Sequence, residues 1–201
     1  MENTSTRGNI ASAFLAGVCI AIAGTIYLKL GGVTGAVLFA FGLLAVVAWQ
    51  LNLFTGKSQF VWGRALPQYG RLLNMLLWNF VGRMAVAAVV SNPVLTDSAE
   101  AIIATRLSQG AVRCFFLSIG CGFIMTTAVR SANIDKNWWP LLFGVPVFII
   151  CGFPHCVADA FYLCSISPDF MANSLPGIVP YYAAIVTGNY LGCNLFRLKD
   201  I

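Results

Sequence analysis

The sequence predicts an all-α integral membrane protein with six transmembrane helices, arranged as two inverted three-helix repeats whose second and fifth helices are broken. Of its 201 residues, 59% are hydrophobic and only 9% are charged, which is more apolar surface than one soluble core can bury. Four uncharged runs, 8–28, 30–56, 137–158 and 170–196, are each long enough to cross about 30 Å of hydrocarbon at about 1.5 Å per residue. Glycine, proline and asparagine interrupt two of these runs.

The six spans belong to a single membrane domain, 1–201. We expect them at about 9–29, 33–64, 72–92, 107–129, 138–165 and 176–196. The third and fourth are apolar but carry Arg83 and Arg113. Turn residues separate the spans at Gly31-Gly32, at Asn92-Pro93 and at Ser167-Pro168-Asp169. The polar start is short and lacks a persuasive signal cleavage site, so we expect the first span to remain in the protein.

The basic residues predict the orientation of the spans. With the N-terminus inside, the cytoplasmic segments contain Arg7, Lys57, Arg64, Arg71, Arg130, Lys136, Arg197 and Lys199. Lys29 and Arg106 then lie outside. This bias predicts cytoplasmic N- and C-termini in the inner membrane. The net charge of +5 therefore reflects topology, and no basic patch indicates nucleic-acid binding.

The second and fifth spans are predicted to break near 52–57 (Asn-Leu-Phe-Thr-Gly-Lys) and near 152–155 (Gly-Phe-Pro-His). A break at membrane depth frees backbone groups that need protein or water partners, so breaks line cavities. The span that follows each break contains an Asn and a Gly three residues apart, Asn79 and Gly82 or Asn189 and Gly192. Because each repeat has three spans, an odd number, the second repeat is inverted in the membrane relative to the first. Inverted repeats of this kind place their binding site near the midplane of the bilayer. Helix N-termini pointing there favour an anion.

His155 is the only histidine and lies within the uncharged run 137–158. A titratable ring in an apolar span marks a transport route or a proton relay. Burial disfavours the imidazolium, so we expect a neutral ring that donates one N–H to an entering anion. The permeant would then be a small monovalent weak acid that crosses with little or no net charge. The alternative is a structural histidine bonded to backbone carbonyls.

Three motifs resemble the formate/nitrite transporter family. They are Phe39-x-x-x-Leu43 with Leu53-Phe54-Thr55-Gly56, then Pro146-Val147-Phe148 through Gly152-Phe153-x-His155-x-x-Ala158, and Gly188-Asn189-x-x-Gly192. The resemblance covers nearly the whole chain. It implies an aquaporin-like protomer within a homopentamer that transports small monovalent anions such as formate, nitrite or hydrosulfide, with or without a proton. It implies no catalysis, no cofactor and no metal.

The resemblance also implies roles for individual residues. Thr55 and His155 would occupy the two broken loops, and Phe39, Leu43 and Phe148 would form apolar constrictions that exclude hydrated ions. Arg106, near the start of the fourth span, would gather anions. The chain departs from the family pattern at four positions. It has Pro154 where Glu is common, Asp159 where Asn is common, Trp78 where Gly is usual, and Arg83 after Gly82.

Several residues keep a second interpretation. Thr55 could only cap a half-helix, and Arg106 could be an interfacial anchor. Asp159 could orient His155, pair with Arg83 or face a neighbouring protomer, and Arg83 and Arg113 could serve protomer packing. Asn79 and Asn189 are expected to bridge the broken loops to neighbouring helices, which Gly82 and Gly192 allow to approach closely.

Two other classes of function compete with anion transport. A membrane thiol or quinone redox enzyme would use the cysteines at 19, 114, 121, 151, 156, 164 and 193, but no pair has Cys-x-x-Cys spacing. We interpret them as packing residues. A channel for neutral solutes could share the inverted repeats and a pore histidine.

Overall fold

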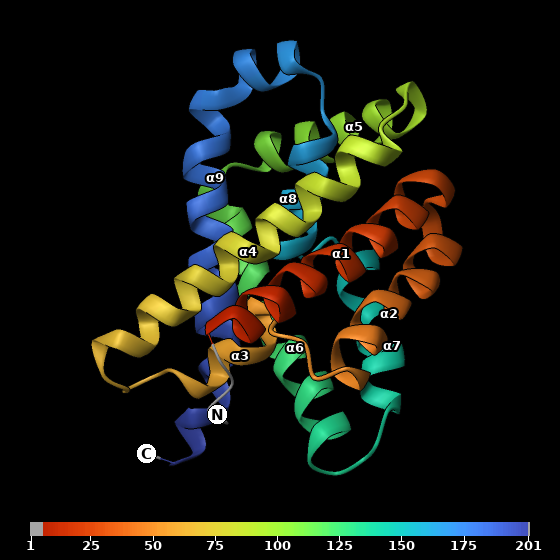
Figure 1. Ribbon diagram of the computed structural model, residues 1–201. Helices are drawn as coiled ribbons and strands as arrows, with labels where there is room; N and C mark the ends of the chain where they lie inside the picture. Colours follow the sequence, from red (N-terminus) through yellow and green to blue (C-terminus); the bar gives the residue numbers. More distant parts are fainter. Residues whose placement is uncertain (1–5, 201) are drawn as a thin grey trace.

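The computed structural model describes residues 6–200, apart from the side chains of 6, 60, 199 and 200, and the described part is helical without strands (Figure 1). The first repeat contains α1 (Thr6–Leu30), α2 (Gly32–Ala48), α3 (Phe54–Lys57), η1 (Ser58–Phe60) and α4 (Leu66–Val90). The second contains α6 (Ala111–Asn133), α7 (Trp139–Ile150), α8 (Cys156–Ser165), α9 (Pro168–Asn194) and η2 (Leu195–Asp200). Helix α5 (Pro93–Gln109) joins them. The ends of the predicted domain, 1–5 and 201, lie outside the described residues.

Two predicted connections are helical instead. The sequence predicts a connection between the spans 72–92 and 107–129, whereas α5 occupies 93–109, and α9 begins at 168 rather than at the predicted 176. The side chain of Asn92 accepts from Leu95 N at 3.2 Å, and that of Ser167 accepts from Phe170 N at 3.2 Å. Asn-Pro and Ser-Pro are typical of turns, but these pairs also form the cap and the first residue of a helix.

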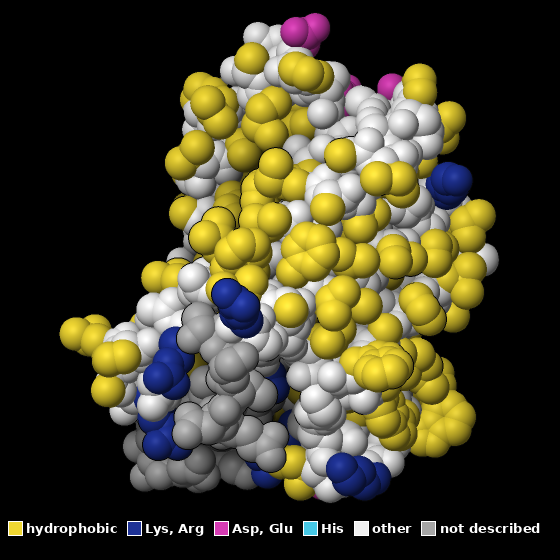
Figure 2. All heavy atoms as spheres, in the orientation of Figure 1, with side chains coloured by type: hydrophobic (Ala, Val, Ile, Leu, Met, Phe, Trp, Pro, Cys, Tyr) yellow, Lys and Arg dark blue, Asp and Glu magenta, His cyan; other side chains and the backbone are white. Residues whose placement is uncertain are grey.

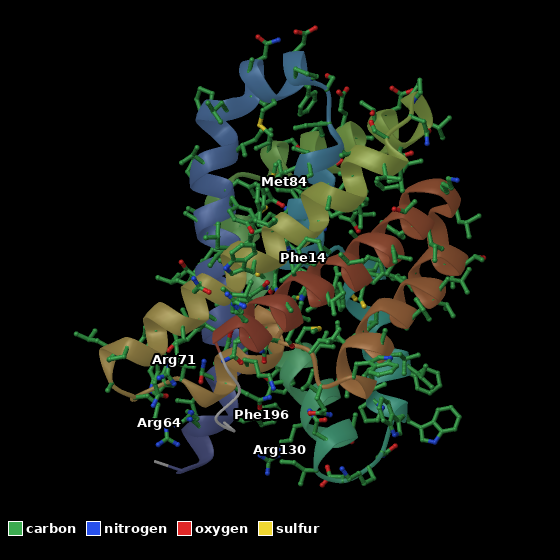
Figure 3. The ribbon with its side chains drawn as sticks, viewed as in Figure 1. Phe14, Arg64, Arg71, Met84, Arg130 and Phe196 are labelled. Atoms are coloured by element: carbon green, nitrogen blue, oxygen red, sulfur yellow. The ribbon has the colours of Figure 1, made fainter. Side chains whose placement is uncertain are left out.

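The repeats are assembled from matching helix pairs. Helix α1 packs against α4 as α6 packs against α9, while α2 packs against α7 across the repeat interface (Figure 1). Figure 3 labels Phe14 on α1 and Met84 on α4, the neighbouring helix. A Cβ added to Gly82 would lie 2.1 Å from the Phe14 carbonyl oxygen, and one added to Gly192 would lie 2.0 Å from that of Ile119. Backbones therefore touch at both crossings, which only glycine permits.

Three helical segments are long and apolar enough to cross a membrane, judged by length and composition: Arg7–Leu30, Leu66–Val90 and Ala111–Asn133. Helices α2, α7 and α8 are shorter apolar helices, because each break divides one crossing into two pieces. The sixth predicted span, α9, is 27 residues long but falls outside this criterion, and it contains Pro176 and Pro180.

Charge is distributed unevenly along the molecule. Hydrophobic side chains cover the middle of the face in Figure 2, acidic side chains lie at its upper end, and most of its basic ones lie at its lower end. Arg64, Arg71 and Arg130 lie at that lower end in Figure 3, where the chain also finishes. The apolar middle matches the chemistry of a bilayer interior.

Glu100 joins α5 to the start of α9, in segments between the spans. Its Oε1 accepts from Ser167 Oγ at 2.6 Å and from Ser167 N at 3.0 Å. The bond from the Ser167 hydroxyl, followed by that from the backbone, holds the pKa of Glu100 below its ordinary value of 4.5. A carboxyl group whose pKa is lower in the folded state than in the unfolded state stabilises the fold at pH values above its unfolded-state pKa. This contribution is lost as the pH falls through its folded-state pKa.

The variant Glu100→Gln keeps an acceptor but cannot titrate, so its melting midpoint should fall less than that of the wild type between pH 7 and pH 4. Differential scanning fluorimetry at both pH values measures this. The matched control is Asp97→Asn, because Asp97 is an exposed carboxylate on the same helix. An equal fall in the wild type and Glu100→Gln would contradict the assignment.

Candidate functional site

The break in the fifth span positions His155. Helix α7 ends at Ile150, the chain turns through Gly152 at a φ of 69°, and His155 is the N-cap of α8. Its Nδ1 accepts from Ala158 N at 3.2 Å. Its Nε2 lies 3.0 Å from Thr55 Oγ1. The ring is only 2% exposed, so it is an interior group held from both sides.

The cap determines which nitrogen of the neutral ring carries the hydrogen. Because Nδ1 accepts a hydrogen bond from a backbone N–H, it carries a lone pair and no hydrogen. The hydrogen of the neutral ring therefore resides on Nε2. The Nε2–H therefore donates to Thr55 Oγ1. The Thr55 hydroxyl hydrogen has no acceptor among the hydrogen bonds of the described residues, so this pair ends in an unused donor.

Thr55 comes from the other break, 100 residues away in the sequence. It lies within the four-residue helix α3, whose N-cap is Leu53 and makes no side-chain cap bond. Its hydroxyl is directed at His155 and does not cap α3. The structure therefore brings together the two loop residues that the resemblance singles out.

Equivalent asparagines hold the two breaks. Asn79 accepts from Phe54 N at 3.0 Å and donates to Ala13 O and Asn52 O. In the second repeat, Asn189 accepts from Cys156 N at 2.7 Å and donates to Ser118 O and Pro154 O. This correspondence makes Leu53 the counterpart of His155. The scaffold is symmetric, but only one of the two loops presents an imidazole.

Aromatic side chains pack beside His155. The Phe148 ring centre lies 5.5 Å from that of His155, and Phe39 meets Phe148 edge to face at 6.4 Å. Leu43 follows Phe39 by four residues on α2 and is buried with them. Phe148 on α7 thus contacts both the imidazole and Phe39, and Leu43 is buried on the same helix as Phe39.

Arg106 is placed differently from the expected role of an open anion collector. Its Nη1 donates to the Gly152 carbonyl in the break, and its Nε lies 3.5 Å from Asp159 Oδ2. The Tyr181 hydroxyl donates to the same carboxylate oxygen. Arg106 and Asp159 have side-chain exposures of only 11% and 2%, so the guanidinium charge is compensated locally. Sequence reasoning missed Tyr181, because no local motif links it to Asp159.

Arg83 is also interior and is not available for protomer packing. Its side chain is 0% exposed, and its Nη1 donates to Val157 O at 2.5 Å. The guanidinium carbon lies 5.6 Å from the Phe80 ring centre, a cation–π contact. Asp159 pairs with Arg106 and not with Arg83. Arg113, by contrast, is exposed on α6.

The cysteines and other potential ligands form no metal cluster within residues 6–200. All seven thiols are free; Cys114, Cys121, Cys156 and Cys193 are buried, and Cys151 is exposed. In that part of the chain, no group of three or more His, Cys, Asp or Glu side chains is arranged to hold a metal ion.

The comparisons with known proteins agree with one another. The sequence model described as Formate/nitrite transporter matches residues 2–197. A probable formate transporter of Methanothermobacter thermautotrophicus is 25% identical, over 93% of this chain and 85% of its own. A formate-nitrite transporter of Plasmodium knowlesi is also 25% identical, over 80% of this chain but only 61% of its own length.

Two solved structures share the fold. A pentameric formate channel with formate bound superposes with a TM-score of 0.81 at 20% identity, covering 96% of this chain and 94% of its own. An FNT family ion channel superposes with a TM-score of 0.77 at 21% identity, covering 94% and 87%. The predicted fold class is confirmed by these superpositions.

Proposed function

The chain belongs to the formate/nitrite transporter family, and we propose that it passes small monovalent weak-acid anions, such as formate, nitrite or hydrosulfide, across the cytoplasmic membrane. The pair formed by His155 and Thr55 between the two breaks is the observation that carries this proposal. It provides hydrogen-bond donors at the meeting point of the two repeats, where inverted-repeat transporters bind their substrate.

Two features of the site favour an anion. Helices α3 and α8 begin at Phe54 and Cys156, immediately beside the pair, and helix N-termini present partial positive charge. The Nε2–H of His155 and the hydroxyl of Thr55 form a donor relay whose last hydrogen is unused. An anion that accepts this hydrogen replaces part of its lost hydration.

Apolar side chains favour a weak acid. Phe148 packs against His155, and Phe39 and Leu43 are buried on α2, where Phe39 meets Phe148, so an anion sheds water when it approaches. Desolvation disfavours the charged form of an acid and raises its affinity for a proton. Anion entry and proton uptake are thereby coupled, and the complex crosses the apolar segment with little net charge.

The bond to Nδ1 supports the role of His155 as a hydrogen-bond donor. Protonation of the ring would place a second N–H opposite the Ala158 N–H and break the cap. The neutral ring has one N–H, which it can share without becoming charged. We propose that the coupled proton enters with the anion, and that His155 stabilises the pair.

The proposed topology has six crossings in one domain, with cytoplasmic N- and C-termini in the inner membrane. The collection of basic side chains at the end where η2 lies supports this orientation (Figures 2 and 3). We propose a homopentamer with one path per protomer, in line with the pentameric formate channel that shares the fold. Passage requires no catalytic step and no cofactor.

A substrate panel in proteoliposomes tests the proposal. Formate, nitrite and hydrosulfide should enter faster than acetate and lactate, and their entry should accelerate as external pH is lowered. Protein-free liposomes correct for leakage of the neutral acids. The proposal would be contradicted if a neutral solute such as urea entered as fast as the anions and if flux did not depend on the anion or on pH. That result would favour the channel for neutral solutes.

A further inference from the structure

Among the described residues, the interior around the two breaks contains more cations than anions. Arg83, Arg106 and Asp159 are charged side chains in the interior around the breaks, with exposures of 0%, 11% and 2%. Lys57, in the first break, is a further cation and is partly buried. Arg106 and Asp159 pair with each other. His155 is neutral when its Nδ1 accepts from Ala158. Arg83 therefore remains as an uncompensated positive charge.

The surroundings of Arg83 supply no counter-charge. Its Nε and Nη2 have no hydrogen-bond partner among the described residues. The titratable groups that act on it are the Tyr182 phenol and the thiols of Cys156 and Cys164, none of which is ordinarily negative at neutral pH. A buried, unpaired cation is strongly unfavourable, so a negative charge at some stage of function would relieve it.

Neither a lipid nor a neighbouring protomer can supply this charge directly. The side chain is completely buried within a single protomer. A lateral cavity of about 740 Å³ is lined by Phe80, Met84 and Tyr182, mostly through apolar surface, but Arg83 does not line it. The remaining source of a negative charge is the interior path itself.

Arg83 lies directly behind the proposed path. It follows Asn79 by one helical turn on α4, and Asn79 holds the first break through Phe54 N and Asn52 O. Its own Nη1 binds Val157 O in the first turn of α8, two residues after His155. The guanidinium is thus fixed beside both breaks, separated from the path by the start of α8.

We propose that Arg83 is the fixed counter-charge of the transported anion. It acts through space from behind the wall of the path, and it stabilises one negative charge at the His155 and Thr55 pair. Charge interactions weaken slowly with distance where the dielectric constant is low, so direct contact is unnecessary. This inference rests on the proposed function and identifies a residue that determines charge selectivity.

The test measures the concentration dependence of formate uptake by the full chain in liposomes. Arg83→Gln should raise the apparent KM at least tenfold, which corresponds to 1.4 kcal/mol, while Arg83→Lys should stay within threefold of the wild type. Arg113→Gln is the matched control, because it removes an exposed arginine from α6 and should leave the KM unchanged. Melting midpoints and gel-filtration profiles identify folded variants.

Asp159→Asn provides the opposite change of charge. It releases the charge of Arg106, and the apparent KM should fall at least threefold. A purely structural role for Arg83 would not make the two variants shift KM in opposite directions. If Arg83→Gln does not fold, the Asp159→Asn and Arg83→Lys variants still test the proposed role of Arg83.

Three outcomes would overturn the inference. The first two are a folded Arg83→Gln variant whose KM stays within twofold of the wild type and an Asp159→Asn variant whose KM rises. Loss of uptake in a folded Arg83→Lys variant would do the same, since that variant keeps the charge. A wild-type protein that takes up no anion from the panel would instead refute the proposed function.

Discussion

Replacing His155 with alanine or phenylalanine should abolish the flux of weak-acid anions into liposomes. Both changes remove the Nε2–H that begins the donor relay to Thr55. A hydrogen bond to a charged group contributes about 1.5–3 kcal/mol, so its loss alone lowers flux roughly 10- to 150-fold. Alanine also removes the ring that packs against Phe148, and phenylalanine places an apolar ring where the anion loses its water.

A graded series separates the donor role from the structural role of the ring. His155→Asn can still accept from the backbone at an N-cap and still donates an N–H, so it should retain measurable flux when alanine retains none. Thr55→Val preserves shape and removes the last donor, and it should lower flux with little change in melting midpoint. Wild-type flux in folded His155→Ala protein would refute the mechanism.

Replacing Gly192 with leucine should prevent assembly of the fold, and alanine should destabilise it strongly. The new Cβ would lie 2.0 Å from Ile119 O and 3.0 Å from Gly122 Cα, so two helix backbones must separate. Overpacking of a rigid contact costs about 1–3 kcal/mol or more, which lowers the melting midpoint by roughly 2–4 °C per kcal/mol in a chain of this size. Gly82→Ala should behave alike, because its Cβ meets Phe14 O.

The matched control is Gly70→Ala. Gly70 also lies within a helix, α4, but nothing lies within 4 Å of an added Cβ. Alanine there should be neutral or stabilising by up to about 1 kcal/mol. Thermal melting of the purified variants in detergent distinguishes the sites, and equal midpoints for Gly192→Ala and Gly70→Ala would contradict the close approach.

Local chemistry accounts for the features that could be predicted. Long uncharged runs indicate membrane crossings because hydrocarbon excludes charge, and the two Gly- and Pro-containing breaks follow from lost backbone hydrogen bonding. The same local reasoning failed at Asn92-Pro93 and Ser167-Pro168, which begin α5 and α9. Helix caps and turns use the same residues, and the sequence alone does not distinguish them.

The charged residues show where local reasoning ends. Arg83, Arg106 and Asp159 could each be recognised as unusual within apolar spans, but their pairing could not be deduced. Asp159 had three plausible interpretations, and the structure adopts a fourth, an ion pair with Arg106 that also accepts from Tyr181. The distances that decide between such pairings depend on how helices cross.

By itself, then, the sequence determined the all-helical membrane class, the position of both breaks and the single histidine beside one of them. These properties are encoded by neighbouring residues along the chain. Only the tertiary structure decided that Thr55 meets His155, that Arg106 pairs with Asp159 and that Arg83 has no anionic partner among the described residues. Those outcomes depend on contacts between residues tens of positions apart, because packing of the two inverted repeats brings them together.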